Sequence, residues 1–420
     1  MIDFAELKRD PAEFARRIAR KGASREGVER ALALDARRLA LLRQVEDLRS
    51  RQNAASREIA AAKKSGASAD ALLAEMKSVK EKERELSERL AAIEAEVDGV
   101  LRLLPNPPDD DVPDGKAAED NREIARWGTP PEFDFAPKAH WDLGLLDMEA
   151  GGRMSGSGFP VLKGDGARLE RALGQFLLDL AGRHGYAEVS PPLLLREEVM
   201  DGVTIREKFR DDMYLSEKDG LYLLPTAEHP LTNLHRDQVL DAASLPLRYT
   251  ALTPCFRREA GAAGKDTRGL LRVHQFWKVE MMSFTAPEQS KDEHERMLGN
   301  ARAALEALGI PHRVVFVCTG DMSMANRRQY DLEAWAAGVG RWLEVSSVSN
   351  FGDWQARRCG TRCKSGKEKP RVAHTLNGSA LGMPRTLVAI LENGQREDGS
   401  ISVPGVLQRY MDGRTSLGPP

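Results

Sequence analysis

The 420-residue sequence predicts an α+β fold, in which an N-terminal antiparallel coiled-coil arm precedes a domain built on an antiparallel β-sheet. Residues 25–104 contain no proline and are rich in Ala, Leu, Glu, Lys and Arg, a composition that favours long helices. From about Arg126 onward, prolines, glycines and short β-branched or aromatic runs return between amphipathic helices. Because loops and not regular βα units separate many of the strand candidates, the sheet is expected to be antiparallel.

Apolar residues in the second half of the arm follow alternating steps of four and three, which is the seam of a coiled coil. The seam comprises Leu72, Met76, Val79, Leu86, Leu90, Ile93, Val97, Val100 and Leu104, with Glu83 as its one polar interruption. The first half keeps this spacing more weakly, at Leu34, Leu41, Val45, Leu48, Ala55, Ile59 and Ala62. The segment Ser65–Ser68 (SGAS) supplies a turn, so the two helices are expected to fold back on each other.

Charge differs between the two halves of the arm. Residues 25–64 hold ten Lys/Arg against six Asp/Glu, whereas residues 69–104 hold six against nine. Two interpretations remain open at this point. The basic half is either an ordinary solvated surface or a surface that contacts the phosphates of an RNA backbone.

Prolines end the second helix, because Pro105-Asn106-Pro107-Pro108 forbids its continuation. This segment predicts two domains, 1–108 and 109–420. In the second domain we expect amphipathic helices at 167–184 and 290–308, and strands at 221–224, 312–318, 342–347 and 371–376.

Composition excludes several classes of protein. With 62 basic and 64 acidic side chains, any nucleic-acid contact must come from local basic surface. Four cysteines make neither a disulfide framework nor a paired zinc knuckle. No segment has the length of apolar sequence that crosses a bilayer, and the first ten residues do not resemble a signal peptide, so we expect a cytoplasmic protein without membrane attachment.

The common nucleotide-binding signatures are also missing. No GxxxxGK[ST] motif occurs, and residues 261–267 (GAAGKDT) are only a fragment of one. The glycines of residues 151–158 follow no convincing strand and are interpreted as a loop. What remains is a set of Arg and Glu residues between strands, which suits the binding of a polyphosphate and a divalent ion.

Several segments carry a specific resemblance to one family. Residues 253–261 (TPCFRREAG), 266–270 (DTRGL) and 274–276 (HQF) look like motif 2 of class II aminoacyl-tRNA synthetases in its seryl version, and 374–379 (HTLNGS) and 384–393 (PRTLVAILEN) resemble motif 3. Residues 185–192 (GYAEVSPP) resemble motif 1, while 225–228 (PTAE) and 344–350 (EVSSVSN) match two further seryl elements. The chain thus resembles bacterial-type seryl-tRNA synthetases over essentially its whole length.

The resemblance implies an ATP site with a catalytic set of Arg257, Glu259 and Arg385. Arg257 would hold the α-phosphate and the substrate carboxylate, because a guanidinium binds such oxygens bidentately. Glu259 would accept a hydrogen bond from the adenine amino group, and Phe276 and Arg385 would cover the two faces of the ring, with Arg385 also reaching the γ-phosphate.

Glu344 and Ser347 would bind ATP through Mg²⁺, to which they would present oxygen ligands. The serine-binding set implied by the resemblance is Thr226, Glu228, Arg257, Glu280, Asn377 and Ser379. Such polar groups would be left unpaired by a substrate without the hydroxyl.

The activity implied is ATP-dependent formation of seryl-adenylate and transfer of serine to tRNA(Ser), with tRNA(Sec) as a further candidate, by a homodimer whose interface includes the motif 1 proline. Alternatives remain open: a divergent paralogue with another role or acceptor, and a noncatalytic RNA-binding protein. Read singly, Arg257, Glu228, Glu280 and Glu344 could be ion-pair partners and Phe276 a core residue. Four positions depart from the family pattern, namely Gly202–Phe209 (GVTIREKF), Trp277, Ala380–Pro384 (ALGMP) and Gly394.

Overall fold

The computed structural model describes residues 1–65, 68–260 and 268–418. The predicted arm turn at Gly66-Ala67 and the segment 261–267, which includes Gly261, Asp266 and Thr267 of the motif 2 resemblance, lie outside these residues. The chain forms two compact units, Met1–Pro105 and Asn106–Pro420. No helix in the described ranges is long and apolar enough to cross a membrane.

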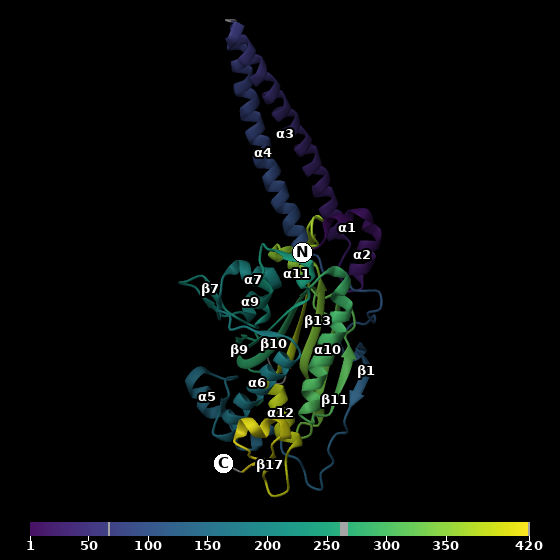
Figure 1. Cartoon of the computed structure of the whole chain (residues 1–420), viewed down its shortest axis with the longest axis vertical. Coiled ribbons are helices and arrows are strands. Elements are labelled where there is room, and N and C mark those ends of the chain that lie inside the picture. The colour runs from purple at the N-terminus through teal and green to yellow at the C-terminus, as the bar shows by residue number, and fades with distance from the viewer. Residues whose placement is uncertain (66–67, 261–267, 419–420) are drawn as a thin grey trace. The chain divides into compact units, whose positions relative to one another are not determined.

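The first unit is helical and contains the predicted hairpin. Two short helices, α1 (Phe4–Arg9) and α2 (Pro11–Ala19), precede the long helices α3 (Glu26–Ser65) and α4 (Asp70–Leu103), which pack against each other (Figure 1). Asp3 and Asp10 cap the two short helices through their side chains. Helix α4 ends at Leu103, directly before the proline segment.

The predicted seam is confirmed, because every one of its positions is buried or partly buried. The polar interruption has a partner on the facing helix, since Arg49 Nε donates to Glu83 Oε1 at 2.9 Å. Ser87, one turn further along α4, donates to the same oxygen at 2.9 Å. The hairpin therefore holds one carboxylate in an otherwise apolar seam by pairing it across the two helices.

The second unit is built on an eight-stranded sheet, which confirms the α+β prediction (Figure 1). All neighbours in it are antiparallel except the parallel pair of the last two strands. Its order is β1 (Arg122–Trp127), β11 (His312–Phe316), β12 (Arg328–Ala336), β13 (Arg341–Gly352), β16 (His374–Gly382), β10 (Gln275–Thr285), β9 (Leu247–Phe256) and β4 (Ala187–Glu188).

Three helices pack on the sheet and share one apolar core with it: α6 (Asp165–Arg183), α10 (Ser290–Ala307) and α12 (Met383–Asn393). Two of them confirm the predicted helices at 167–184 and 290–308. Strand β10 shows how the two faces of the sheet differ. Val279 and Met281 belong to the core under the helices, whereas Lys278 and Glu280 alternate with them and point the other way.

The smaller elements surround the sheet. The helices are α5 (Met148–Ser155), α7 (Glu197–Val203), α8 (Arg206–Phe209), α9 (Glu228–Asn233), α11 (Trp354–Cys359) and α13 (Gly405–Gln408). The short strands are β2 (Leu146–Asp147), β3 (Val161–Leu162), β5 (Leu194–Leu195), β6 (Leu215–Ser216), β7 (Leu221–Leu223), β8 (Val239–Asp241), β14 (Arg362–Lys364), β15 (Arg371–Val372), β17 (Ile401–Ser402) and β18 (Ser416–Leu417).

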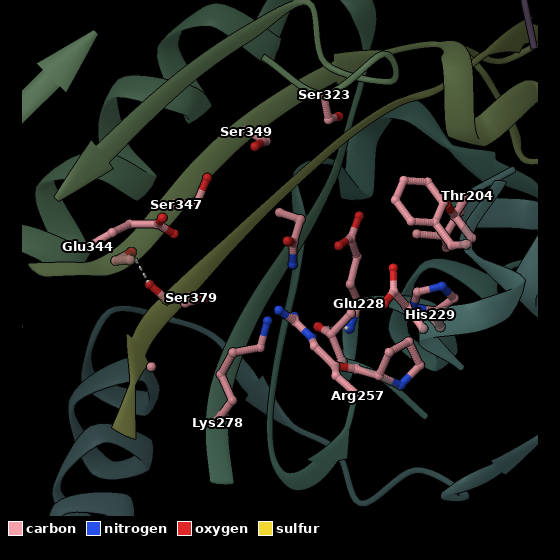
Figure 2. Close-up of a pocket in the computed structure, with 18 of the residues that line it drawn as sticks. Thr204, Glu228, His229, Arg257, Lys278, Ser323, Glu344, Ser347, Ser349 and Ser379 are labelled. Carbon is pink, nitrogen blue, oxygen red and sulfur yellow. Dashed lines mark hydrogen bonds between the residues drawn. The ribbon is translucent and has the colours of Figure 1, made fainter. Parts of the chain in front are cut away.

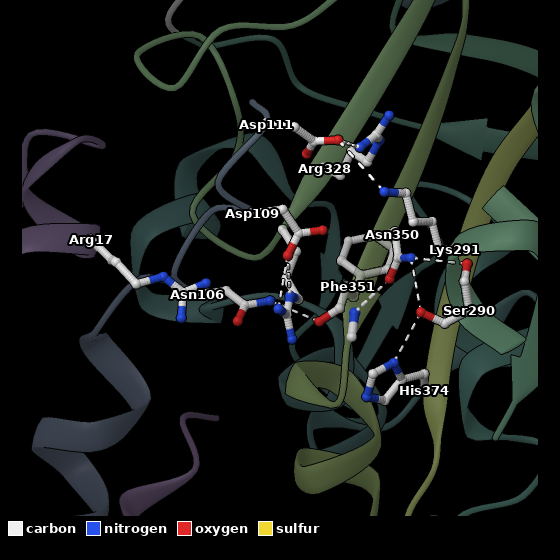
Figure 3. Close-up of polar contacts among 12 residues, drawn as sticks. Arg17, Asn106, Asp109, Asp111, Ser290, Lys291, Arg328, Asn350, Phe351 and His374 are labelled. Atoms are coloured by element: carbon white, nitrogen blue, oxygen red, sulfur yellow. Dashed lines mark hydrogen bonds and ion pairs between the residues drawn. The ribbon is translucent and has the colours of Figure 1, made fainter. Parts of the chain in front are cut away.

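Polar contacts tie the first residues of the second unit to its sheet (Figure 3). Asn106 is buried and its side-chain amide donates to the carbonyls of Ala325 and Phe351 at 2.9 and 2.7 Å. Asp109 pairs with Arg327 at 2.7 Å, and Asp111 pairs with Arg328. These bonds explain why the compact unit begins at Asn106, inside the proline segment.

Two sequence predictions need correction. The expected loop at 151–158 is wrong for its first half, because α5 continues to Ser155 after Asp147 caps it by accepting from Ala150 N at 2.8 Å. Gly151 is needed there for packing, since a Cβ atom would lie 1.6 Å from the carbonyl oxygen of Phe159. The strand predicted at 371–376 is split, and its two parts, β15 and the start of β16, belong to different sheets.

Candidate active site

A cavity of about 740 Å³ lies on the face of the sheet opposite α6 and α12. Ten of the eleven residues singled out from the sequence line it: Thr226, Glu228, Arg257, Glu259, Phe276, Glu344, Ser347, Asn377, Ser379 and Arg385. The eleventh, Glu280, is fully buried beneath the cavity surface. Figure 2 shows Glu344, Ser347 and Ser379 on one side of the cavity and Glu228 and His229 on the other.

Glu280 is held by three side chains, one on its own strand β10, one in the loop before α9 and one on β16. Lys278, two residues earlier on β10, forms an ion pair with it, and both side chains are largely buried. Thr226 Oγ1 donates to Glu280 Oε2 at 2.5 Å, and Ser379 Oγ donates to Oε1 at 3.3 Å. Glu280 therefore lies where its carboxylate organises the predicted serine pocket. Lys278 was missed, although its place between Phe276 and Glu280 in the two-residue period of β10 could have indicated it.

Glu228 begins α9 and is the second carboxylate in this part of the cavity. Gln355 Nε2 donates to its Oε1 at 2.7 Å. Burial, together with the neighbouring Glu280 carboxylate, raises the pKa of Glu228 to about 7, although Lys278 lowers it. The site therefore has a carboxyl group that a bound cation would help to ionise.

His229 follows Glu228, lines the cavity and is also absent from the sequence-based set. Its side chain is 4% exposed, and neither ring nitrogen has a hydrogen-bond partner among the described residues. Burial, with Lys278 and Arg257 nearby, lowers the pKa of this imidazole to about 3. The ring is thus neutral near pH 7 and can contribute only as an uncharged donor or acceptor.

Arg257 and Phe276 lie together, with the guanidinium carbon 5.2 Å from the ring centroid. Arg257 Nε donates to the carbonyl of Pro225 at 3.2 Å, which leaves the terminal nitrogens for a ligand. Glu259 pairs with Arg272 and has a φ of 51°, a left-handed conformation that side chains other than glycine adopt at a cost.

Arg385, near the start of α12, is fixed by two backbone carbonyls. Its Nε donates to Leu271 O and its Nη1 to Glu344 O, both at 3.0 Å. The first bond joins α12 to the stretch between residues 266–270 and 274–276 of the motif 2 resemblance. The second places the guanidinium beside β13, which carries the predicted metal ligands.

A β-bulge brings those ligands to one face of β13. Leu332 pairs with Ser346 but the next residue, Glu333, pairs with Glu344, so Val345 is the extra residue. Without it, Glu344 and Ser347 would point to opposite faces, because they are three residues apart. Ser347 Oγ accepts from Gln329 Nε2 at 2.9 Å, and the Glu344 carboxylate is half exposed.

Protein oxygens alone do not enclose a metal ion at this position. Within residues 1–65, 68–260 and 268–418 no cluster of three His, Cys, Asp or Glu side chains could hold one. Asp331, buried beside Ser347, has a pKa raised well above its usual range by burial and by Glu344. One carboxylate and one hydroxyl fit Mg²⁺ that is bound mostly by phosphate oxygens and water.

The four departures from the family pattern differ in their relation to the cavity. Val203, Thr204, Ile205 and Phe209 line it, as does Pro384. Trp277 points to the opposite face of β10 from Phe276 and is 38% exposed. At Gly394 a Cβ atom would lie 2.8 Å from Ile390 O, so the turn after α12 accepts no aromatic residue in its present form.

Comparison with known proteins agrees with this geometry. Residues 209–394 match the tRNA synthetase class II core domain (G, H, P, S and T), so the sheet and its cavity are those of a class II synthetase. Residues 1–108 match the seryl-tRNA synthetase N-terminal domain.

Full-length relatives narrow the assignment. The chain is 49% identical to a serine–tRNA ligase of Rhizorhabdus wittichii, with 100% of both chains covered, and 46% identical to one of Nitratidesulfovibrio vulgaris, with 98% of both covered. The crystal structure of seryl-tRNA synthetase from Pyrococcus horikoshii complexed with ATP matches with a TM-score of 0.94 at 37% identity over 100% of both chains. The chain belongs to the seryl-tRNA synthetase family.

Proposed function

We propose that this protein is a serine–tRNA ligase, which activates L-serine with ATP and transfers it to the 3′ end of tRNA(Ser). The observation that carries this proposal is one cavity lined by Arg257, Lys278 and the carboxylates of Glu228 and Glu344, with the Glu280 carboxylate paired to Lys278 beneath its surface. A nucleotide's phosphates need the cations, and an amino acid's ammonium needs the carboxylates. The serine–tRNA ligases that match over the full length support the choice of amino acid.

Serine would bind where Thr226, Glu280 and Ser379 already share hydrogen bonds. Glu280 accepts from the substrate hydroxyl or ammonium, and Glu228 faces the ammonium. Alanine lacks the hydroxyl and would leave buried polar groups unpaired, which is the strongest basis for rejecting a small competitor. Asn377 closes the pocket from β16, where its side chain is anchored to Met281 O at 3.0 Å.

ATP would lie between Phe276 and Arg385, with its α-phosphate at Arg257. The serine carboxylate attacks that phosphate and pyrophosphate leaves, so the protein supplies position and charge without a covalent nucleophile. Glu344 and Ser347 would hold Mg²⁺, which neutralises phosphate charge when bound. The Pyrococcus horikoshii relative was solved as a complex with ATP, which supports ATP as the nucleotide.

The remaining parts of the proposal concern partners. Residues 1–108 bind tRNA through the basic half of the arm, the protein acts in the cytoplasm as a homodimer that uses motif 1, and tRNA(Sec) is a second substrate to test. A paralogue with another acceptor would keep adenylation but not charge tRNA(Ser). A noncatalytic RNA-binding protein would lack adenylation altogether.

Serine-dependent ATP–pyrophosphate exchange tests the proposal. Wild-type protein should exchange with serine in preference to alanine and threonine, and R257Q should lose about 10²-fold or more in kcat. R258Q is the matched control, because Arg258 does not line the cavity and lies over the Tyr214 ring at 5.7 Å. No exchange by the wild type, or equal loss in both variants, would contradict the assignment.

The arm has its own test. A chain without residues 25–104 should keep exchange and lose charging of tRNA(Ser), because the phosphate-contacting surface is gone. Charging at the full-length rate would refute the role given to the arm.

A further inference from the structure

A fully buried, hydrogen-bonded pair of a histidine and a glutamate lies outside the set of substrate-binding residues. His140, in the short turn at 140–142, and Glu392, near the end of α12, are both 0% exposed. Glu392 Oε1 accepts from His140 Nδ1 at 2.7 Å and from the His140 backbone N–H at 2.9 Å. Its Oε2 accepts from the backbone N–H groups of Gly338 and Val339 at 2.8 and 3.0 Å. Four donors thus hold the carboxylate, and the carboxylate fixes the imidazole.

The other ring nitrogen of His140 faces Leu270, which lies within the motif 2 resemblance. The backbone N–H of Leu270 donates to His140 Nε2 at 2.9 Å. Nε2 must therefore carry a lone pair and Nδ1 must carry the proton, which is the tautomer that the Glu392 carboxylate selects. A proton on Nε2 would point at the Leu270 N–H. The pair therefore requires a neutral imidazole that donates on one side and accepts on the other.

Leu270 begins a stretch that touches two predicted nucleotide-binding residues. The carbonyl of the following residue, Leu271, accepts from Arg385 Nε at 3.0 Å. The side chain of Arg272, one residue further on, pairs with Glu259. Gly269, just before, leaves no room for a side chain, because a Cβ atom would lie 2.2 Å from His140 Nε2. One continuous series of contacts runs from Glu392 through His140 and Leu270 to Arg385.

We propose that His140 is a positioning residue for the nucleotide site: it anchors residues 270–272 so that Arg385 and Glu259 lie where the adenine and phosphates bind. This inference rests on the proposed function. It concerns ATP and not serine, because the series of contacts reaches Arg385 and Glu259 but none of the side chains bonded to Glu280. Loss of the Leu270 bond frees the carbonyl that holds Arg385.

Two substitutions test the hydrogen bonds of the two His140 ring nitrogens separately. In H140N the amide nitrogen takes the place of Nδ1 and keeps the bond to Glu392, but nothing reaches Leu270. In H140Q the longer side chain places its amide oxygen near Nε2 and can still accept from the Leu270 N–H. G269A attacks the same contact independently, by displacing Nε2. H312N is the matched control, since His312 is equally buried, is bonded through Nδ1 to Ile310 O at 3.0 Å and does not line the cavity.

Exchange kinetics and calorimetric ATP binding on the full chain provide the readout. H140N and G269A should raise the KM and Kd for ATP about tenfold, the effect of one lost hydrogen bond, with serine KM within about twofold. H140Q should stay within about threefold of wild type, and H312N should lower the melting temperature without changing KM for ATP.

An unchanged ATP affinity in H140N and G269A would overturn the proposal. Equal increases in the KM for ATP and for serine, or the same increase in H312N, would also overturn it, because they indicate a general structural role. Absence of exchange in the wild type would defeat the proposed function instead. The ATP affinities of H140N and H140Q would then still decide this inference, through calorimetry.

Discussion

The buried pair of Lys278 and Glu280 makes the sharpest stability prediction. Replacing Lys278 by Met removes the cation while Glu280 stays fully buried beside Glu228. Breaking such a pair costs about 3–5 kcal/mol, because one charge remains uncompensated.

The double variant K278M/E280Q isolates the cause. It removes both charges while a glutamine oxygen can still accept from Thr226 Oγ1, so it should recover most of the free energy of unfolding that K278M loses. Both variants should lack serine-dependent exchange, because the polar recognition of serine is lost. The double variant is thus expected to recover stability without recovering activity.

Tryptophan fluorescence during urea unfolding is the appropriate assay. All six tryptophans lie between residues 127 and 354, so the signal reports on the unit Asn106–Pro420 without contribution from the arm. A K278M cost below about 1 kcal/mol, or a double variant that is less stable than K278M, would refute the reasoning.

Three further predictions address other parts of the chain. Because the pKa of Glu228 is raised to about 7, the KM for serine should fall by up to tenfold per pH unit as the pH rises toward 7 and should level off above it. In exchange assays E228Q should flatten this pH profile. A profile of E228Q identical to that of the wild type would exclude Glu228 as the group responsible. M281A should lower the free energy of unfolding in urea by about 2–5 kcal/mol with little change in the KM for serine, since Met281 is 1% exposed under the helices. A loss below about 1 kcal/mol would contradict that packing. E83L should stabilise the arm by about 1 kcal/mol, because an apolar seam residue replaces an ion pair whose Arg49 side chain is 60% exposed. The stabilisation should appear as slower hydrogen exchange in α3 and α4. Faster exchange would show that the Arg49–Glu83 pair stabilises the arm more than an apolar seam residue does.

Periodicity and composition were sufficient to predict the helical arm of this protein and where it ends. The steps of four and three predicted which side of α4 faces α3, because residues at that spacing share one side of a helix whatever the rest of the chain does. Proline ended the arm for a local reason, since it has no N–H and restricts the residue before it. The family could likewise be identified from contiguous motifs such as residues 253–261 and 384–393.

Where local pattern failed, a distant contact was responsible. Residues 151–155 are helical although glycine-rich, because Gly151 packs against the carbonyl of Phe159. The sequence predicted that Glu344 and Ser347 act together, but only the bulge at Val345 puts them on one face. Glu280 was expected in the pocket, whereas its burial beneath the surface depends on Lys278 of the same strand, Thr226 before α9 and Ser379 on β16.

The sequence by itself determined the helical hairpin, the antiparallel character of the sheet and the family, because each follows from spacing or from contiguous residues. Only the tertiary structure decided how the charges of the site are balanced and how its backbone is held. Lys278 compensates a fully buried carboxylate, and His140 is bonded to Leu270, 130 residues away, and to Glu392, 252 residues away. Whether such groups are buried, and which of them meet, depends on how segments that are far apart in the sequence pack together in the whole domain.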